Sequence, residues 1–239
     1  MTRFLDAGEA GEARGAVVVV DVLRAFSTAA YSFAAGATAI WLVDSVDQAL
    51  TLKAAHPELL AMGEDGGRRI VGFDFANSPW EVSQADLAGR ELVQRTSAGT
   101  RGVVAATGAE RRWCASLVCA TATANAVTAA GLGEPTYVIT GRRSADQRGE
   151  DDLLTAQLIE RVRVGAPVEA DATARAVATS REAAVTLALG RSHVDPRDVE
   201  LAVRVDAFAF AMEARVVSDG LLLTPHVPTE DGRPPQRST

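Results

Sequence analysis

A short apolar run that ends in an acid is the feature that most constrains how this chain can fold. Residues Ala16–Val20 are a compact, mostly β-branched segment closed by Asp21, and an Ala-rich segment over 24–35 follows and ends at Gly36. A strand without polar alternation is typical of a parallel sheet buried on both faces. The first segment is therefore predicted to be such a strand, and the second a helix.

The alternation of short apolar runs with longer amphipathic ones continues along the chain. Further strands are predicted at 39–43, 59–62, 91–95, 115–119, 136–140 and near 214–217, and helices at 46–55, from about 101, at 123–130 and at 151–164. Strands that alternate with helices of about 10–15 residues indicate βαβ units. The predicted fold class is α/β, with a parallel-rich sheet covered on both faces. Residues 16–36 and 115–133 share a weak similarity that is too degenerate to prove a repeat.

Composition and charge narrow the class of protein. The 239 residues carry a formal charge of −7, and 23 of the 24 basic residues are arginine, Lys53 being the exception. An acidic chain argues against binding to duplex nucleic acid. No apolar run reaches the roughly 20 residues of a spanning helix, and residues 1–14 lack a signal pattern. We expect a cytoplasmic protein with no membrane partner, a free N-terminal arm over 1–14 and a disordered tail over 229–239. Cys114 and Cys119 are expected to be buried apolar thiols on one strand.

Polar residues gather where the predicted strands end. These are Asp21, Glu64, Thr96–Thr100 and Thr121. In open α/β sheets ligands bind beyond the carboxyl ends of the strands. All four positions are therefore expected to face one side of the sheet.

The segment from Thr96 to Arg101 has the composition of an anion-binding turn. Small residues let backbone N–H groups approach an oxyanion, the hydroxyls add donors, and a helix N-terminus follows. The same pattern is equally typical of a plain helix cap. Arg24 is a second candidate for anion binding, with an ion pair to Asp21 as its structural alternative.

Several carboxylates are candidates for metal binding. Mg²⁺ is usually held by one or two carboxylates together with water and substrate phosphate. Asp21, at a strand end, is the best single candidate, and Asp74 lies between Phe73 and Phe75. Asp151 and Asp152 open a predicted helix, where acids are also favoured by the helix dipole alone. The three histidines are expected to be surface residues.

Well-known catalytic motifs are missing from the sequence. There is no Walker A loop, GxGxxG, GxSxG or HExxH pattern, and no cysteine is followed six residues later by arginine. A haloacid-dehalogenase phosphatase would need a second aspartate at position 23, which is Leu23. These absences count against P-loop and nicotinamide-binding proteins, against GxSxG and HExxH hydrolases, and against the thiolate and haloacid-dehalogenase types of phosphatase.

Five motifs in order give the chain a specific resemblance. They are VDVLRAFST (20–28), GEDGGRRIVGFDFANSPWE (63–81), TSAGTRG (96–102), ATATANAV (120–127) and GEDDLLTAQLI (149–159). Over about residues 15–165 the chain resembles the 2-phosphosulfolactate phosphatase family. The resemblance implies a three-layer α/β/α fold of two similar halves, about 15–110 and 111–228, within one unit over 15–228. It also implies Mg²⁺-dependent hydrolysis of (R)-2-phospho-3-sulfolactate to 3-sulfolactate and phosphate, a step toward coenzyme M.

The resemblance also suggests which residues carry the chemistry. Acid–base or nucleophilic roles are expected for Asp21, Glu64, Asp74, Ser97 and Thr100; phosphate and substrate binding for Arg24, Asn77, Ser78, Thr96, Gly99, Arg101 and Asn125; and metal binding for Asp21, Glu64, Asp74 and Asp152. The nucleophile, whether water, Asp21, Ser97 or Thr100, stays open. A small anionic phosphorylated substrate is expected as the partner, and a homodimer is the default oligomer.

The chain departs from the family pattern at Ala98, where asparagine is common, at Ala76, where glycine is frequent, and over 119–123. These departures leave two alternatives open. In the first alternative, the chain is a phosphatase of another small phosphorylated hydroxy-acid. In the second, it is an anion-binding homologue without turnover. Residues after 165 have no role assigned by sequence, except that 206–212 resemble a packing segment with Asp206 as an outside site candidate.

Overall fold

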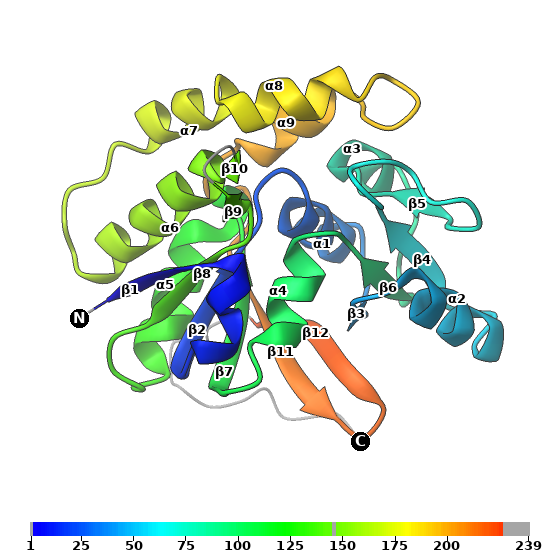
Figure 1. The fold of residues 1–239 in the computed structure, drawn as a ribbon, viewed down its shortest axis with the longest axis horizontal. Coiled ribbons are helices and arrows are strands. Elements are labelled where there is room, and N and C mark those ends of the chain that lie inside the picture. The colour runs from blue at the N-terminus through cyan, green and yellow to red at the C-terminus, as the bar shows by residue number, and fades with distance from the viewer. Residues whose placement is uncertain (1, 145–146, 227–239) are drawn as a thin grey trace.

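The computed structural model describes residues 2–144 and 147–226 and has an α/β fold (Figure 1). A large, mostly parallel, strongly curled sheet is flanked by helices, as the sequence predicts. In the described part of the chain the sheet contains β1 (Arg3–Asp6), β2 (Gly15–Val20), β3 (Ala39–Val43), β4 (Leu60–Gly63), β5 (Phe75–Ala76), β6 (Glu91–Arg95), β7 (Ala109–Ala115), β8 (Thr136–Ile139), β11 (Ala211–Val217) and β12 (Gly220–His226).

Helices cover the sheet and a small hairpin lies outside it. The α-helices are α1 (Ala25–Ala34), α2 (Val46–Ala55), α3 (Pro79–Ser83), α4 (Gly99–Ala105), α5 (Ala120–Ala129), α6 (Glu150–Arg163), α7 (Ala170–Ala178), α8 (Arg181–Ala188) and α9 (Arg197–Ala202). Two 3₁₀ helices, η1 (Ala7–Glu12) and η2 (Leu117–Cys119), and the two-stranded hairpin of β9 (Arg142–Ser144) and β10 (Gln147–Arg148) complete the set.

The sheet consists of two parallel groups joined by an antiparallel hairpin. The strand order is β1-β8-β2-β7-β11-β12-β3-β6-β4-β5. All pairings within the first four strands and within the last four are parallel, whereas β7–β11, β11–β12 and β12–β3 are antiparallel. In a flat sheet these three reversals would send the carboxyl ends of the two groups to opposite edges. Figure 1 shows the sheet curled between the two groups. This curl brings both sets of ends to the residues that line one cavity.

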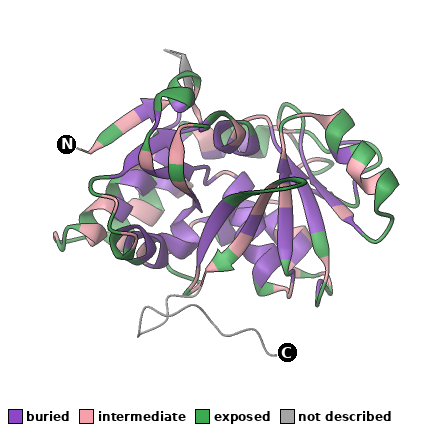
Figure 2. Ribbon diagram, turned by 90° about the horizontal axis from the view of Figure 1, so that it is seen from below, coloured by how far each residue is buried: buried purple, intermediate pink, exposed green. Residues whose placement is uncertain are grey.

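Strand β2 is buried on both faces, as its unbroken apolar run predicts. Val17 and Val19 belong to one hydrophobic cluster, and Val18 and Val20 to another. Alternate side chains of a strand point to opposite faces, so β2 separates the two main cores. Figure 2 shows the strands buried along most of their length, while the helices expose their outer faces. The predicted bounds of β3, β6 and α2 match the structure.

The prediction of a strand over 115–119 is wrong. The strand is β7, which ends at Ala115, and after Ser116 the residues Leu117–Cys119 form η2 before α5. The charges of Arg111 and Arg112 disguised this strand in the sequence. They are tolerated because Arg111 pairs with Glu213 of β11 and Arg112 donates to the carbonyl of Ala106. Consequently Cys114 and Cys119 do not share a strand, although both are buried free thiols.

Other differences concern short or peripheral elements. The loop over 63–79 contains the short strand β5, and the single strand expected near 214–217 is one arm of the β11–β12 hairpin. The range 1–14 holds β1 and η1. The tail over 229–239 lies outside the described residues. Within the described ranges, no helix has the length and apolar character needed to cross a membrane.

Candidate active site

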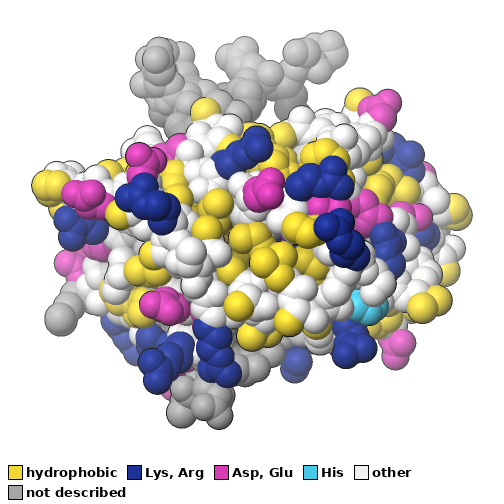
Figure 3. All heavy atoms as spheres, turned by 90° about the horizontal axis from the view of Figure 1, so that it is seen from above, with side chains coloured by type: hydrophobic (Ala, Val, Ile, Leu, Met, Phe, Trp, Pro, Cys, Tyr) yellow, Lys and Arg dark blue, Asp and Glu magenta, His cyan; other side chains and the backbone are white. Residues whose placement is uncertain are grey.

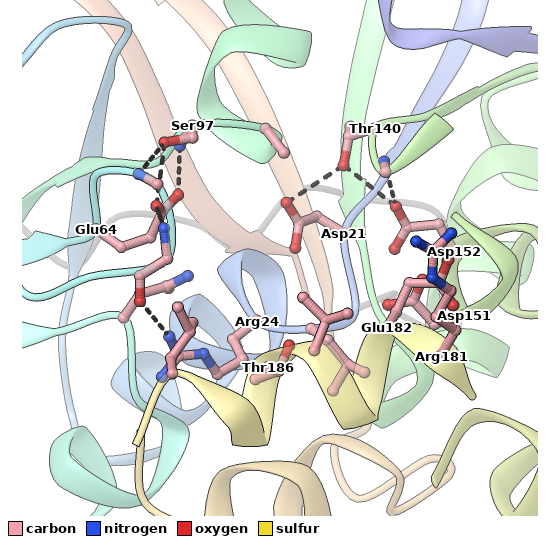
Figure 4. Close-up of a pocket in the computed structure, with 18 residues that line it drawn as sticks. Asp21, Arg24, Glu64, Ser97, Thr140, Asp151, Asp152, Arg181, Glu182 and Thr186 are labelled. Carbon is pink, nitrogen blue, oxygen red and sulfur yellow. Dashed lines mark hydrogen bonds between the residues drawn. The ribbon is translucent and has the colours of Figure 1, made fainter. Parts of the chain in front are cut away.

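A cavity of about 420 Å³ opens at the carboxyl ends of the strands (Figure 4). Its walls come from the ends of β2, β4, β6 and β8, from the start of α6, and from one side of α8. The lining residues are Asp21, Leu23, Arg24, Glu64, Gly66, Gly67, Asn77, Ser97, Ala98, Thr140, Gly141, Asp151, Asp152, Arg181, Glu182, Val185, Thr186 and Leu189. The cavity thus joins seven stretches of the chain, spread between residues 21 and 189.

One side of the cavity holds three buried aspartates. The hydroxyl of Thr140 lies 3.2 Å from Oδ2 of Asp21 and 3.3 Å from Oδ2 of Asp152. Backbone N–H groups orient both carboxylates: Ala25 donates to Asp21, and Gly141 donates to Asp152. The side chains of Asp21 and Asp152 therefore converge on one point, from the end of β2 and the start of α6.

Burial and mutual repulsion make these acids harder to ionise. Loss of solvent, with the nearby charges of Asp21 and Glu182, raises the pKa of Asp151 to about 7. Burial and the charges of Asp151 and Asp21 raise the pKa of Asp152 well above its usual range. Clustered carboxylates with raised pKa values are common at sites that bind a cation or transfer a proton.

Glu64 lies across the cavity from the aspartates and organises its own wall (Figure 4). Its carboxylate accepts hydrogen bonds from the backbone N–H groups of Ser97 and Gly67, and from the Ser97 hydroxyl at 3.1 Å. The preceding Gly63 has a φ of 147°, and a Cβ there would lie 1.9 Å from the Arg95 carbonyl oxygen. Only glycine allows β4 and β6 to approach this closely.

The segment over 96–101 contains Ala98, the N-cap of α4, which makes no side-chain cap hydrogen bond. The Thr96 hydroxyl accepts from the Thr100 N–H at 3.0 Å, and the Thr100 hydroxyl accepts from the Thr96 N–H at 2.8 Å. Both side chains are buried, and Thr100 does not line the cavity. Of this segment, Ser97 and Ala98 line the cavity. Thr96 and Thr100 instead bond to each other at the start of α4.

Arg24 and Asn77 reach the cavity near its floor. Arg24 does not pair with Asp21, the alternative considered from sequence; it pairs with Asp198 at 3.0 Å. Asn77 is 4% exposed, and its Oδ1 has no hydrogen-bond partner within the part of the chain described. A buried unpaired amide oxygen is costly unless a ligand or water satisfies it.

Other predicted site residues do not line this cavity. Asp74 pairs with Lys53 and accepts the N–H of Ala61. Ser78 caps α3 and donates to Asp198. Arg101 and Asn125 are exposed on α4 and α5, Gly99 packs behind Asp21, and Thr121 binds Asp206. Their expected roles in the chemistry stay predictions without support from this geometry.

Helix α8 forms a wall that sequence reasoning missed. Arg181, Glu182, Val185 and Thr186 line the cavity from this helix, and Leu189 follows it. Nothing in the spacing of these residues indicated a site. Asp151 was indicated by the adjacent acid pair at a helix start. Figure 3, which looks onto the side where α8 lies, shows hydrophobic side chains gathered between basic and acidic ones.

Comparison with known proteins identifies the family. Residues 5–206 match the family described as 2-phosphosulpholactate phosphatase, a range that contains every residue lining the cavity. This chain belongs to the 2-phosphosulfolactate phosphatase family.

Individual members of the 2-phosphosulfolactate phosphatase family are similar over much of the chain. A probable 2-phosphosulfolactate phosphatase of Thermus thermophilus is 34% identical over 82% of this chain and 77% of its own length. Those of Bacillus subtilis and Deinococcus radiodurans are 31% and 39% identical, over 63% and 59% of this chain. The matches span 65% and 59% of those two proteins.

The donors in this 2-phosphosulfolactate phosphatase family member suit a hard cation. Five carboxylates and two guanidinium groups line the cavity, and oxygen donors are what Mg²⁺ prefers. Among the described residues, no three acidic, histidine or cysteine side chains are already placed as a ligand set. Mg²⁺ needs only one or two carboxylates when water and phosphate complete its shell. The Asp21–Asp152 pair beside Thr140 therefore fits the metal by donor chemistry.

Proposed function

We propose that this chain is a Mg²⁺-dependent phosphatase that hydrolyses 2-phospho-3-sulfolactate to 3-sulfolactate and phosphate. The observation that carries the proposal is the convergence of Asp21 and Asp152 on the Thr140 hydroxyl, in a cavity that Arg24 also lines. The family of the chain supports the same substrate. Such a substrate carries phosphate, carboxylate and sulfonate groups, so it needs several positive partners.

The described residues divide this task between the sides of the cavity. Asp21 and Asp152 would hold Mg²⁺, which offsets the negative charge of the phosphoryl oxygens when it is bound. Arg24 and Arg181 supply guanidinium groups that suit anionic oxygens. Asn77 offers an amide within the same cavity. The Thr140 hydroxyl lies within hydrogen-bond distance of both aspartates, so its one proton can be donated to either carboxylate.

Glu64 has a supporting part in this scheme. Its two oxygens already accept three hydrogen bonds from the 66–67 turn and from Ser97. These bonds fix the positions of Gly67 and Ser97, both of which line the cavity. We therefore assign Glu64 to shaping the wall across from the metal, in place of the metal-ligand role expected from sequence.

Phosphate release from 2-phosphosulfolactate, with and without Mg²⁺, tests the proposal directly. We expect metal-dependent release that falls at least about 100-fold in Asp21→Asn and Asp152→Asn, because each change removes an ionised ligand and one charge. Asp47→Asn is the matched control, since Asp47 is exposed on α2, far from the cavity. Release that is independent of Mg²⁺, or unchanged in both site variants, would contradict the proposal.

One observation favours a related substrate as the second candidate. Ala98 lines the cavity where the family pattern commonly has asparagine, so one side-chain donor is missing there. Loss of a donor that recognises a substrate oxygen changes specificity more than it changes the reaction. A panel of phosphorylated hydroxy-acids, assayed under the same conditions, separates the two candidates. A folded protein that releases phosphate from none of them would support the anion-binding alternative.

A further inference from the structure

We propose that Asp198 is a positioning residue that holds Arg24 and the Asn77 turn at the cavity. The inference rests on the proposed function, because it assigns Arg24 to binding an anionic group of the substrate. Asp198 lies at the start of α9 (Arg197–Ala202) and is fully buried. It does not line the cavity, whereas Arg24 and Asn77 do.

The carboxylate of Asp198 accepts four hydrogen bonds, two on each oxygen. Oδ2 accepts from the Arg24 guanidinium at 3.0 Å and from the backbone N–H of Asp195 at 3.1 Å. Oδ1 accepts from the Ser78 hydroxyl and from the backbone N–H of Trp80, the latter at 3.1 Å. Each oxygen therefore binds a different segment: Oδ2 binds Arg24, and Oδ1 binds residues 78–80.

Through Oδ2, Asp198 fixes the Arg24 guanidinium. Besides Asp198, Arg24 donates to the carbonyl oxygens of His193 at 3.2 Å and of Gly67 at 3.1 Å. Both carbonyls are neutral, so among these partners Asp198 supplies the charge that compensates a cation only 3% exposed. A buried guanidinium without its counter-ion is strongly unfavourable. Asp198 thus decides whether Arg24 stays at the cavity wall.

Through Oδ1, Asp198 fixes the turn that presents Asn77. Ser78 caps α3, and Trp80 lies in the first turn of that helix. By accepting from both, Asp198 anchors the residues directly after Asn77, whose Oδ1 is buried without a partner in the described part of the protein. One carboxylate from α9 therefore sets the positions of two cavity groups that come from the β2–α1 turn and the 77–80 turn.

A double-mutant cycle on phosphate binding tests this role. We expect Asp198→Asn to raise the KM for 2-phosphosulfolactate, and the Kd for inorganic phosphate, by roughly 10- to 100-fold, with a smaller change in kcat. In the Arg24→Ala background the same substitution should change these constants clearly less than in the wild type, because one of the two groups that Asp198 positions is gone. Asp195→Asn is the matched control, since the Asp195 side chain pairs with the exposed Arg197 instead.

Chemical rescue separates positioning from a merely structural role. Guanidinium ion added to Arg24→Ala should restore part of the phosphate affinity, because Asp198 still offers its carboxylate to the added cation. It should restore none in the Arg24→Ala/Asp198→Asn variant. Equal rescue in both proteins, or additive effects of the two substitutions, would overturn the proposal.

The binding readout also separates this proposal from the proposed function. If the wild-type protein binds phosphate but does not hydrolyse 2-phosphosulfolactate, the proposed substrate is wrong while the cycle still tests Asp198. If phosphate does not bind to the wild type, or binds equally well to Asp198→Asn, the positioning role itself is refuted.

Discussion

Gly99 shows how a single missing side chain shapes the cavity wall. A Cβ built there would lie 2.7 Å from the Cβ of Ala25 and 2.8 Å from Oδ2 of Asp21. The first residue of α4 therefore packs directly behind the aspartate that the proposed reaction depends on. At the scale of the residue, the close approach of the Gly99 backbone to the Asp21 carboxylate shapes the cavity wall more than the anion-binding turn expected from sequence.

We expect Gly99→Ala to lower both stability and activity. The added methyl group must displace Asp21 or separate α4 from α1, and overpacking of this kind costs about 1–3 kcal/mol of unfolding free energy. Urea denaturation measures the stability, and phosphate release measures the activity. Gly8→Ala is the control, because a Cβ at Gly8 meets nothing within 4 Å. Wild-type activity in Gly99→Ala would show that Asp21 has room to move without consequence.

At the scale of elements, two serine helix caps differ in the other hydrogen bonds that they make. Ser45 caps α2 by accepting from the Gln48 N–H at 3.2 Å, at an open surface position. Ser78 caps α3 in the same way at 3.1 Å, but its hydroxyl also donates to the buried Asp198. Both serines cap their helices in the same way, but only Ser78 also connects its helix to the buried Asp198.

We expect Ser78→Ala to cost about 2–4 kcal/mol of unfolding free energy, and Ser45→Ala about 1 kcal/mol. The difference arises because Ser78→Ala also removes a hydrogen bond to a buried charge. Urea denaturation of the two variants under identical conditions measures it. Equal losses would mean that the Ser78–Asp198 hydrogen bond adds nothing to stability.

The hairpin β11–β12 is attached to the first strand group partly by charge. Glu213 of β11 is buried and accepts from Arg111 of β7 at 2.7 Å and from Arg215 at 2.6 Å. Burial by itself would raise the pKa of Glu213, but the hydrogen bonds from the two arginines outweigh it, so the pKa is lowered. The ionised carboxylate is therefore stabilised by folding.

The lowered pKa of Glu213 predicts a pH-dependent contribution to stability. Because the folded pKa lies below the unfolded one, near 4.3, the contribution is complete above that value and is lost as pH falls through the folded pKa. We expect Glu213→Gln to cost about 1–3 kcal/mol at pH 7 and progressively less below pH 4. Denaturation at several pH values measures the difference. A cost that is constant with pH would contradict the linkage.

At the scale of the whole molecule, the hairpin connects the two parallel groups into one sheet. β11 pairs with β7 of the first group, and β12 pairs with β3 of the second. Leu223 of β12 is fully buried in the same cluster as Val17 of β2 and Leu92 of β6. The last described strands of the chain therefore complete a core that the first strands begin.

We expect Leu223→Ala to destabilise the entire protein by about 2–5 kcal/mol while keeping one cooperative transition. The reason is that the cavity left by the leucine lies between both strand groups. Denaturation followed by circular dichroism and by tryptophan fluorescence measures it. Val216→Ala, at a position 72% exposed, serves as the control. Two separate transitions in Leu223→Ala would show that the groups unfold independently.

Sequence reasoning was most accurate where local pattern decides local structure. The apolar run of β2, the bounds of α2, and the strands β3 and β6 followed from periodicity and end signals. It failed at β7, where paired charges hide a strand, and it found only part of the β11–β12 hairpin. Arg111 of β7 pairs with Glu213, a residue about 100 positions away, so no local signal could reveal how its charge is compensated.

The same division holds for the site. The strand ends and the ordered family motifs are local features, and from them the sequence predicted a larger site of which Asp21, Arg24, Glu64, Asn77, Ser97 and Asp152 line the cavity. Only the tertiary structure decided that Asp74 lies outside the cavity and that α8 and Asp198 take part. The curl that brings two opposed strand groups to one cavity arises from long-range pairing and packing, which depend on contacts between distant residues and leave no periodic trace in the chain.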